Sequence, residues 1–481
     1  MHKRAVLHAV GALNVLAGLA MLLPAAVGGA FYREPTAIPI AGAAAIAVGA
    51  GWIMRRLGGT VEDISLRDGF AIVTFGWISV AGLGSLPYLM TGSIPTFSGA
   101  FFESMSGLTT TGSTVIADID ALPRGIVFWR SLTHWMGGMG IIVLSVAILP
   151  LLGVGGMQLM QAEIPGLSAD RLRPRVRQTA TILWGTYALL TLAQTLLLWA
   201  GGMTLFEAVN HAFATMATGG FSTEDTSFAG FSPFIQYVTA VFMFLAGMNF
   251  TLHYSWMAGR WKPLLRNQEL RVYALIVGIV TLGLTVFLWL PGRIGGLEES
   301  FRAALFQTTS IITTTGFASA DYELWVPPAQ VIIILLMLIG GCTGSTSGSI
   351  KVLRHMIIVE EARISMRKLL HPRGVFVYRI QDKPISSDTL ASVSGFLLLY
   401  LFMLAAGVLI LTALGLDALT ALGSAVTTLG NTGPGFGLVG PTETYAPIPA
   451  PPLWVMSALM LLGRLELYTV LILLTRGFWR R

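Results

Sequence analysis

Thr313-Thr314-Thr315-Gly316-Phe317 lies in a strongly apolar part of this 481-residue chain, and three related stretches accompany it. Each is a short polar segment with a glycine at its centre, between two long hydrophobic segments. The other three are Thr109-Thr110-Thr111-Gly112, Ala217-Thr218-Gly219-Gly220-Phe221 and Gly430-Asn431-Thr432-Gly433-Pro434. Because they recur at intervals of about a hundred residues, they predict an internal repeat of four units.

The composition is that of a membrane protein. Hydrophobic residues make up 54% of the chain and charged residues 11%, and the mean hydropathy is +0.73. Soluble domains carry about 25% charged residues, so the pattern predicts a polytopic membrane protein. The apolar segments are long and continuous rather than alternating, which argues against a β-barrel. The single cysteine, Cys342, excludes intramolecular disulfides and multi-thiolate metal sites.

The basic residues follow the positive-inside rule. Most Lys and Arg lie in alternate connections, from Lys3 and Arg4 at the start to Arg480 and Arg481 at the end. The remaining connections hold little beyond Arg33, Arg124, Arg130, Arg293 and Arg302. This asymmetry predicts cytoplasmic termini. A basic groove for nucleic acid is disfavoured, because no basic cluster is interleaved with stacking aromatic residues.

The predicted fold is all-α and polytopic, with an N-terminal helical hairpin and four helix–pore-loop–helix units around a central pore. The hairpin covers residues 1–57, although its first apolar run also resembles a secretory signal. The units cover residues 58–152, 153–259 (including a cytoplasmic connection), 260–359 and 389–481, and residues 360–388 form a further cytoplasmic connection. Four short segments, near 97–108, 205–216, 301–312 and 416–429, are too short to cross a bilayer. They are therefore predicted to be re-entrant and to line a shared pore.

The four loops have the chemistry needed to hold a dehydrated potassium ion. Backbone carbonyls replace its hydration shell, and glycine permits the dihedral angles that turn them toward one axis. Asp225 and Asp321 each follow a loop glycine by five residues, which aligns Gly220, not Gly219, with Gly316. The predicted filter residues are Thr110, Thr111, Gly112, Thr218, Gly219, Gly220, Thr314, Thr315, Gly316, Asn431, Thr432 and Gly433.

Acidic residues occur in or near each short segment, at Glu103, Glu207, Glu299 and Asp417. They are predicted either to cap the helix N-termini or to attract cations to the pore mouth. His134 is predicted to pack between helices or to lie at the membrane interface rather than to bind a metal, because no second histidine lies beside it at metal-ligand spacing. The sequence therefore predicts no transition-metal site and no bound cofactor, with potassium as the transported ion.

The segment 340–349 is hard to keep helical, since glycine costs about 1 kcal/mol per helical position relative to alanine. Its predicted key residues are Gly340, Gly341, Gly344, Ser345 and Gly348. Arg464 lies within an apolar helix, where an arginine costs at least about 2.5–3.5 kcal/mol, so it should face the pore or pair internally. Glu466 points elsewhere on that helix, so a carbonyl of the glycine-rich segment or a cavity is the expected partner. Lys351 is predicted to reach the cytoplasmic interface toward a partner.

Three motifs give the chain a specific resemblance: Trp129–Gly140, Gly340–Lys351 and Gly463–Glu466. Together with the four loops, they resemble the Trk/Ktr/HKT superfamily of potassium transporters over essentially the whole chain. The extra hairpin and the length favour its bacterial TrkH/TrkG branch over the shorter KtrB branch. The resemblance implies potassium uptake across the bacterial inner membrane, a gate formed by residues 340–349 and Arg464, a homodimer, and a cytosolic ring of nucleotide-binding RCK-type subunits related to TrkA.

Several alternatives stay open within this fold. The second and fourth loops depart from a threonine run, which leaves a sodium-permeable or poorly selective cation channel as the alternative, whereas Gly112 implies potassium competence. Residues 340–349 could be a packing kink, and Arg464 a structural arginine satisfied by carbonyls. Coupling to H⁺ or Na⁺ is also open.

An enzyme is disfavoured, because Asp118 and Asp120 are the only close acidic pair beside a loop and no histidine pair accompanies them.

Overall fold

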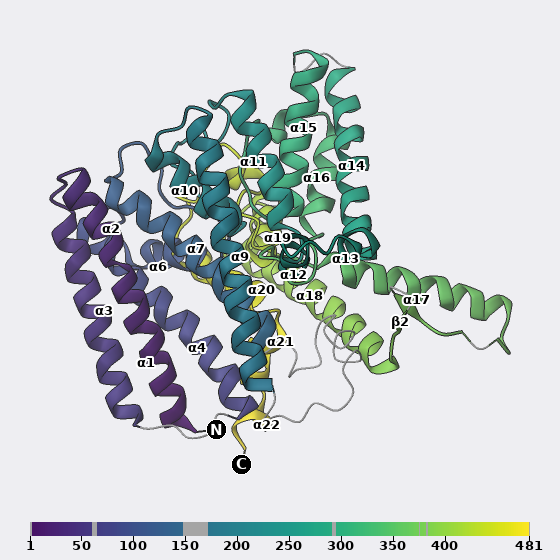
Figure 1. Ribbon diagram of the computed structural model, residues 1–481, viewed down its shortest axis with the longest axis horizontal. Helices are drawn as coiled ribbons and strands as arrows, with labels where there is room; N and C mark the ends of the chain where they lie inside the picture. Colours follow the sequence, from purple (N-terminus) through teal and green to yellow (C-terminus); the bar gives the residue numbers. More distant parts are fainter. Residues whose placement is uncertain are drawn as a thin grey trace.

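The protein is almost entirely helical. The computed structural model describes residues 2–59, 65–147, 172–290, 295–374, 376–380 and 383–480 (Figure 1). In these ranges the only strands are the short antiparallel pair β1 (Arg379–Ile380) and β2 (Lys383–Pro384). The connection predicted near residues 153–178 lies mostly outside the described residues.

The N-terminal hairpin forms as predicted. α1 (Lys3–Ala20), α2 (Leu22–Ala26) and the π-helical turn η1 (Val27–Phe31) make one long leg, and α3 (Ala37–Gly58) is the other (Figure 1). The legs cross closely at Gly11 and Gly51, where a Cβ on either glycine would lie 2.6 Å from the carbonyl oxygen of the other. Glycine is required at both positions because the two backbones are closely packed and leave no room for a side chain.

The described residues contain six helices long and apolar enough to cross a membrane, and two further bent pairs qualify together. The six spans are Lys3–Phe31, Ala37–Gly58, Arg67–Thr91, Thr179–Ala200, Gln268–Trp289 and Ser387–Ala413. The chain is therefore a polytopic, all-helical membrane protein, as the composition predicted.

Four half-helices follow the four outer helices. The outer helices are α4 (Leu66–Gly84) with α5 (Leu86–Thr91), α9 (Leu172–Ala200), α14 (Gln268–Trp289) and α18 (Ser387–Ala413). The half-helices are α6 (Phe97–Leu108), α10 (Leu205–Met216), α15 (Leu297–Ile312) and α19 (Ala418–Gly430). They have 12, 12, 16 and 13 residues. Their lengths of about 18–24 Å fall short of the roughly 30 Å hydrocarbon core, which fits re-entrant segments.

Four inner helices return from the loops. They are α7 (Arg124–Ala147), α11 (Pro233–Ala246) with α12 (Phe250–Met257), α16 (Pro327–Met337), and α20 (Ala450–Arg464) with α21 (Tyr468–Leu471) and η6 (Ile472–Leu474). The second inner helix is not straight, because the chain bends by 103° between α11 and α12. The reason is local: Asn249 leaves helical geometry and its side chain accepts from the Thr251 N–H, starting a new helix.

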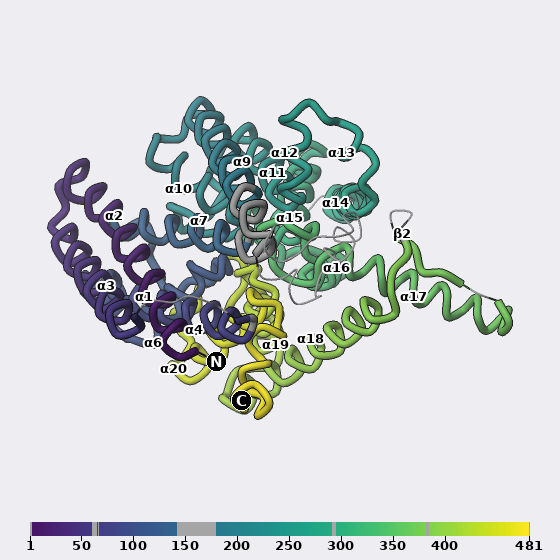
Figure 2. The backbone as a smooth tube through the Cα atoms, turned by 60° about the horizontal axis from the view of Figure 1, so that its bottom comes forward, coloured from purple at the N-terminus to yellow at the C-terminus, as the bar shows by residue number. Residues whose placement is uncertain are grey.

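The remaining elements are one longer helix and several short ones. α17 (Val352–Leu370) follows the glycine-rich segment and projects from the body of the molecule in both views (Figures 1 and 2). The short elements are α13 (Lys262–Arg266), η4 (Tyr322–Leu324), η5 (Gly437–Val439) and α22 (Arg476–Trp479). The N and C labels lie close together in both figures, an arrangement that fits termini on one side of a membrane.

Candidate functional site

The four half-helices end in the same way. In each unit a non-glycine residue takes a left-handed backbone conformation, and the next N–H donates to the carbonyl five residues earlier, as in a Schellman ending. The left-handed residues are Thr110 (φ +52°), Thr218 (+54°), Thr314 (+56°) and Asn431 (+54°). The hydrogen bonds are Thr111 to Ser106, Gly219 to Ala214, Thr315 to Ser310 and Thr432 to Thr427, at 2.8–2.9 Å. Since few non-glycine residues adopt this conformation, its fourfold recurrence confirms the internal repeat.

The loop glycines also share one conformation. Gly112, Gly220, Gly316 and Gly433 have φ of +87°, +83°, +81° and +97°. Residues with a Cβ rarely adopt such angles, which is why glycine is needed here. Gly219 does not have a positive φ, so the alignment of Gly220 with Gly316 is confirmed.

The loops close into a ring, called the loop ring below (residues 109–112, 217–220, 313–316 and 430–433). A Cβ added to Gly112, Gly220 or Gly316 would overlap the backbone carbonyl of the next loop, at Gly219, Thr315 and Thr432 respectively. A Cβ on Gly433 would lie 2.7 Å from the carbonyl oxygen of Thr111, which closes the circle. The structure thus brings together all twelve residues of the predicted filter.

The electrostatics of the loop ring favour a cation. All four half-helices end at the ring, so their C-terminal ends, which carry partial negative charge, converge there. The side chains of Thr110, Thr218, Thr314 and Asn431 are fully buried. The Asn431 amide donates to the Thr111 hydroxyl over 3.0 Å and to the Met460 carbonyl over 2.9 Å, so the unusual fourth loop is tied to the first.

The glycine-rich loop, residues 340–349, packs against the inner end of the loop ring. The Gly348 N–H donates to the Thr314 hydroxyl over 2.6 Å, and a Cβ on Gly348 would overlap the Gly430 carbonyl oxygen. The Thr346 hydroxyl donates to the Met216 carbonyl over 3.1 Å. The loop therefore contacts the half-helix ends of the second, third and fourth units.

Arg464 holds this loop from the fourth inner helix. Its side chain is buried, with Nη1 donating to the Thr346 carbonyl over 2.7 Å and Nη2 to the Gly137 carbonyl over 3.2 Å. The expected carbonyl partner in the glycine-rich loop is confirmed. Glu466 instead pairs with Arg354 over 2.5 Å, just where the chain bends by 110° between α20 and α21.

Lys351 does not lie where the sequence placed it. We expected it to face a partner at the cytoplasmic interface, but its side chain is buried and its ammonium group turns back into the glycine-rich loop. It donates to the hydroxyls of Ser345 and Ser347 over 3.4 and 3.0 Å and also to the Ser347 carbonyl. The physical reason is that the loop folds back on itself, with the Gly340 N–H bonded to the Ile350 carbonyl, and its serines supply acceptors.

The acidic residues of the short segments divide into three kinds. Glu207 and Asp417 cap α10 and α19, as one of the two predicted roles requires. Glu299 lies in the first turn of α15. Glu103 does neither: it is fully buried and pairs with Arg130 over 2.9 Å. Sequence reasoning missed this pair, although Glu103 lies too far into its helix to cap it, which was the available signal.

His134 packs between elements as predicted. Its ring is buried and stacks on Phe221 with centroids 4.1 Å apart. A Cβ on Gly219 would overlap this ring, so the histidine lies directly behind the second loop.

Four equivalent helical units whose loops close one ring inside a multi-pass membrane protein are the architecture expected of a cation transporter. The model of the TrkH family, described as a cation transport protein, matches residues 35–477. The chain therefore belongs to the TrkH family, a family of transporters rather than enzymes.

Individual relatives agree over their whole length. The chain is 38% identical over 488 residues to the Trk system potassium uptake protein TrkH of Salmonella typhimurium, covering all of both chains. It is 36% identical over 486 residues to the Trk system potassium uptake protein TrkG of Escherichia coli K12, covering 100% of this chain and 99% of TrkG. The crystal structure of the potassium transporter TrkH from Vibrio parahaemolyticus matches with a TM-score of 0.92 and 36% identity, again covering all of both chains.

Proposed function

We propose that this chain takes up K⁺ across a bacterial inner membrane, and that ions pass through the loop ring. The observation that carries the proposal is the closure of four equivalent loops on one another, each with a glycine at positive φ. Relatives that match over the full length are potassium uptake proteins of Trk systems. Transport, rather than catalysis, follows from family membership.

The loop ring would work by replacing water. Backbone carbonyls of the loops take the place of the K⁺ hydration shell, and the converging half-helix ends add partial negative charge. The predicted twelve residues, from Thr110 in the first loop to Gly433 in the fourth, supply these carbonyls. The membrane potential drives influx with about 2.3 kcal/mol per charge per 100 mV.

The glycine-rich loop is the proposed gate. It lies against the inner end of the loop ring and is held by contacts from Thr314 and Arg464. An ion leaving the ring toward the cytoplasm must pass it, so the loop has to move before transport. The buried charge of Arg464 beside the loop repels cations while this arrangement lasts.

Regulation from outside the chain completes the proposal. The gate would respond to a cytosolic ring of RCK-type, TrkA-like nucleotide-binding subunits, and two copies of this chain would assemble as a homodimer with their termini in the cytoplasm. Support comes from the Trk-system names of the relatives. The basic connections of the sequence support the orientation.

The test is cation flux in cells that lack their own potassium uptake. We expect the wild-type chain to restore growth at low K⁺, and Gly316→Ser to abolish growth or to open a sodium leak, since Gly316 has φ +81° and contacts the Thr432 carbonyl. The control is Gly278→Ser. Gly278 lies in the outer helix α14, and no atom lies within 4 Å of a Cβ added there. Growth unaffected by Gly316→Ser would contradict the filter.

A second variant decides between potassium and sodium selectivity. Gly112→Ser should shift transport toward sodium, because the new side chain meets the Gly219 carbonyl of the neighbouring loop. Equal sodium and potassium fluxes in the wild type, measured with the cytosolic subunit present, would favour a poorly selective cation channel.

A further inference from the structure

One position in every half-helix carries a buried polar side chain. It lies seven residues before the left-handed residue of each unit (Thr110, Thr218, Thr314 or Asn431), and the four occupants differ: Glu103, His211, Gln307 and Ser424. All four side chains are fully buried. A buried polar group is costly unless it is hydrogen-bonded, so these side chains need partners.

Two of the four side chains form hydrogen bonds, without an ion pair, to residues that follow a loop glycine in sequence. His211 Nε2 lies 3.1 Å from the Ser222 hydroxyl, two residues beyond Gly220. The Gln307 amide donates to the Ala320 carbonyl over 3.0 Å, four residues beyond Gly316. In the fourth unit the Ser424 hydroxyl has no hydrogen-bond partner among the described residues.

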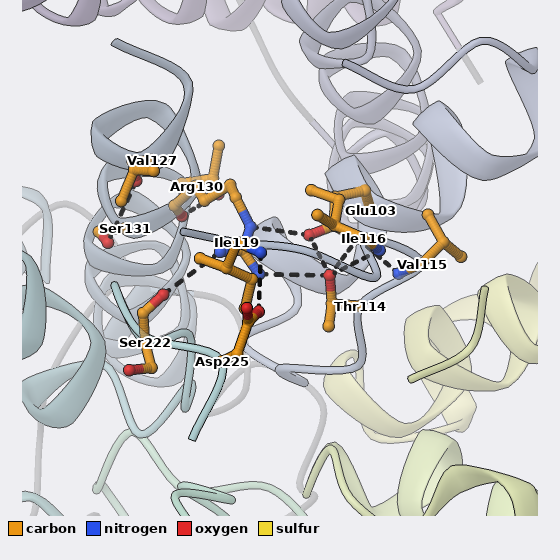
Figure 3. Close-up of polar contacts among 11 residues, drawn as sticks. Glu103, Thr114, Val115, Ile116, Ile119, Val127, Arg130, Ser131, Ser222 and Asp225 are labelled. Atoms are coloured by element: carbon orange, nitrogen blue, oxygen red, sulfur yellow. Dashed lines mark hydrogen bonds and ion pairs between the residues drawn. The ribbon is translucent and has the colours of Figure 1, made fainter. Parts of the chain in front are cut away.

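The first unit uses a full charge at this position (Figure 3). Both carboxylate oxygens of Glu103 accept from the Thr114 hydroxyl, at 2.9 and 3.0 Å, and one also accepts from the Val115 N–H over 2.9 Å. Thr114 lies two residues beyond Gly112, the position that Ser222 has beyond Gly220. The Glu103 carboxylate therefore fixes the chain immediately after the first loop.

Arg130 extends this brace to the second unit. Its Nε donates to Glu103 over 2.9 Å, its Nη2 to the Thr114 hydroxyl and its Nη1 to the Ser222 carbonyl, both over 3.3 Å. Its guanidinium carbon also lies 4.1 Å from the ring centroid of Phe221. Ser222 is thus held by Arg130 at its carbonyl and by His211 at its hydroxyl.

We propose that Glu103 and Arg130 are positioning residues, which set the spacing of the first and second loops and thereby the preference for K⁺ over Na⁺. The inference rests on the proposed potassium pathway. Discrimination by backbone carbonyls is attributed to the size of the cavity that they form and to the number of carbonyls that line it, and both depend on the spacing of the loops. The pair lies behind two adjacent loops and contacts residues that follow both glycines, so it acts on the ring without touching the ion.

A buried ion pair such as Glu103–Arg130 contributes little net folding stability, so we infer that its role is to fix the geometry of the loops. Removing one partner of a buried ion pair leaves an uncompensated charge, whereas replacing both with apolar groups is often neutral for stability. Arginine suits the role because its planar fork donates in several fixed directions at once. Lysine would keep the charge but not the three simultaneous contacts.

The test compares K⁺ and Na⁺ flux in liposomes containing the purified full-length chain with its cytosolic subunit. In Glu103→Gln we expect the ratio of K⁺ to Na⁺ flux to fall by about tenfold or more, because charge-assisted buried hydrogen bonds are lost. The matched control is Glu298→Gln, which removes the same charge from an exposed pair with Arg302 on another half-helix and should leave the ratio unchanged.

A double variant, Glu103→Met with Arg130→Met, separates positioning from stability. We expect it to reach the membrane at wild-type levels and still show the lowered ratio, and Arg130→Lys to show a partial loss. A wild-type ratio in the well-folded double variant would overturn the proposal. A wild-type chain with equal K⁺ and Na⁺ fluxes would instead overturn the proposed function, and the inference with it.

Discussion

The guanidinium of Arg464 donates to the main-chain carbonyl oxygen of Thr346 over 2.7 Å, so the fourth inner helix holds the middle of the glycine-rich loop. The same side chain donates to the Gly137 carbonyl of the first inner helix. One residue thus joins the first and fourth inner helices to the glycine-rich loop that packs against the loop ring. A charged donor bonded to carbonyls gives stronger contacts than a neutral one, which favours the docked loop.

We expect Arg464→Gln to raise basal cation flux in the absence of the cytosolic subunit. The shorter, neutral side chain loses the charge-assisted bonds to Thr346 and Gly137, worth about 1.5–3 kcal/mol each in comparable cases, so the loop leaves its docked position more often. Flux from liposomes without the regulatory subunit measures the effect. Arg476→Gln is the control, because Arg476 is exposed near the end of the chain. Unchanged basal flux would contradict a restraining role for Arg464.

The contact between the loop ring and the glycine-rich loop gives a second prediction. Thr314→Val removes the acceptor of the Gly348 N–H, and an unsatisfied buried N–H costs about 1–3 kcal/mol, so basal flux should rise. Thr110→Val makes the same change at the equivalent residue of the first loop, whose hydroxyl has no partner among the described residues. The measurement is the difference in basal flux between the two variants, and equal fluxes would count against the contact.

Much of this architecture was predictable because the repeat leaves a local signal. Threonine–glycine pairs at regular intervals predicted the loops, and the paired Asp225 and Asp321 fixed the correct alignment of Gly220. Local chemistry also predicted a carbonyl partner for Arg464. The loops and their alignment depend on residues close in sequence. The partner of Arg464 could be predicted because any charged side chain buried in a membrane protein needs polar partners to offset its desolvation.

The features that were not predictable depend on how distant segments meet. Lys351 was expected at an interface, but the fold-back of the glycine-rich loop places serine oxygens around its ammonium group. Glu103 and Arg130 lie 27 positions apart, and only packing of α6 on α7 shows that they pair. The bend at Asn249 was also not predictable, because a helix cap inside an apolar segment competes with continuation of the helix, and tertiary packing decides between them.

Close packing of the inner helices on the half-helices gives a prediction for stability. A Cβ on Gly137 would overlap the Leu108 carbonyl oxygen, and Gly463 has the same relation to the Leu429 carbonyl in the fourth unit. Gly137→Ala should therefore lower the free energy of unfolding by about 1–3 kcal/mol, the usual cost of overpacking. Thermal unfolding of the purified protein in detergent measures it. Gly140→Ala is the control on the same helix, where the nearest atom is 3.6 Å away, and equal Tm values for the two variants would refute the packing argument.

A pH-dependent prediction concerns Glu323, which accepts from the Gly437 N–H over 2.7 Å. Burial raises the pKa of this carboxyl, and the carboxylates of Glu443 and Asp321 add to the rise against the opposing effect of the Gly437 hydrogen bond. The folded protein therefore binds the proton of the Glu323 carboxyl more tightly than the unfolded chain does. This difference stabilises the fold at low pH, and the stabilisation is lost as pH rises through the raised pKa.

Glu323→Gln should remove that loss, because a glutamine carbonyl still accepts from the Gly437 N–H but carries no charge at any pH. The variant and the wild type should have similar Tm values at about pH 4, near the ordinary pKa of glutamate, and the variant should become progressively more stable as pH rises to about 7. Thermal unfolding of both proteins in detergent across this range gives the comparison. Two curves that stay parallel at every pH would show that ionisation of Glu323 does not oppose folding.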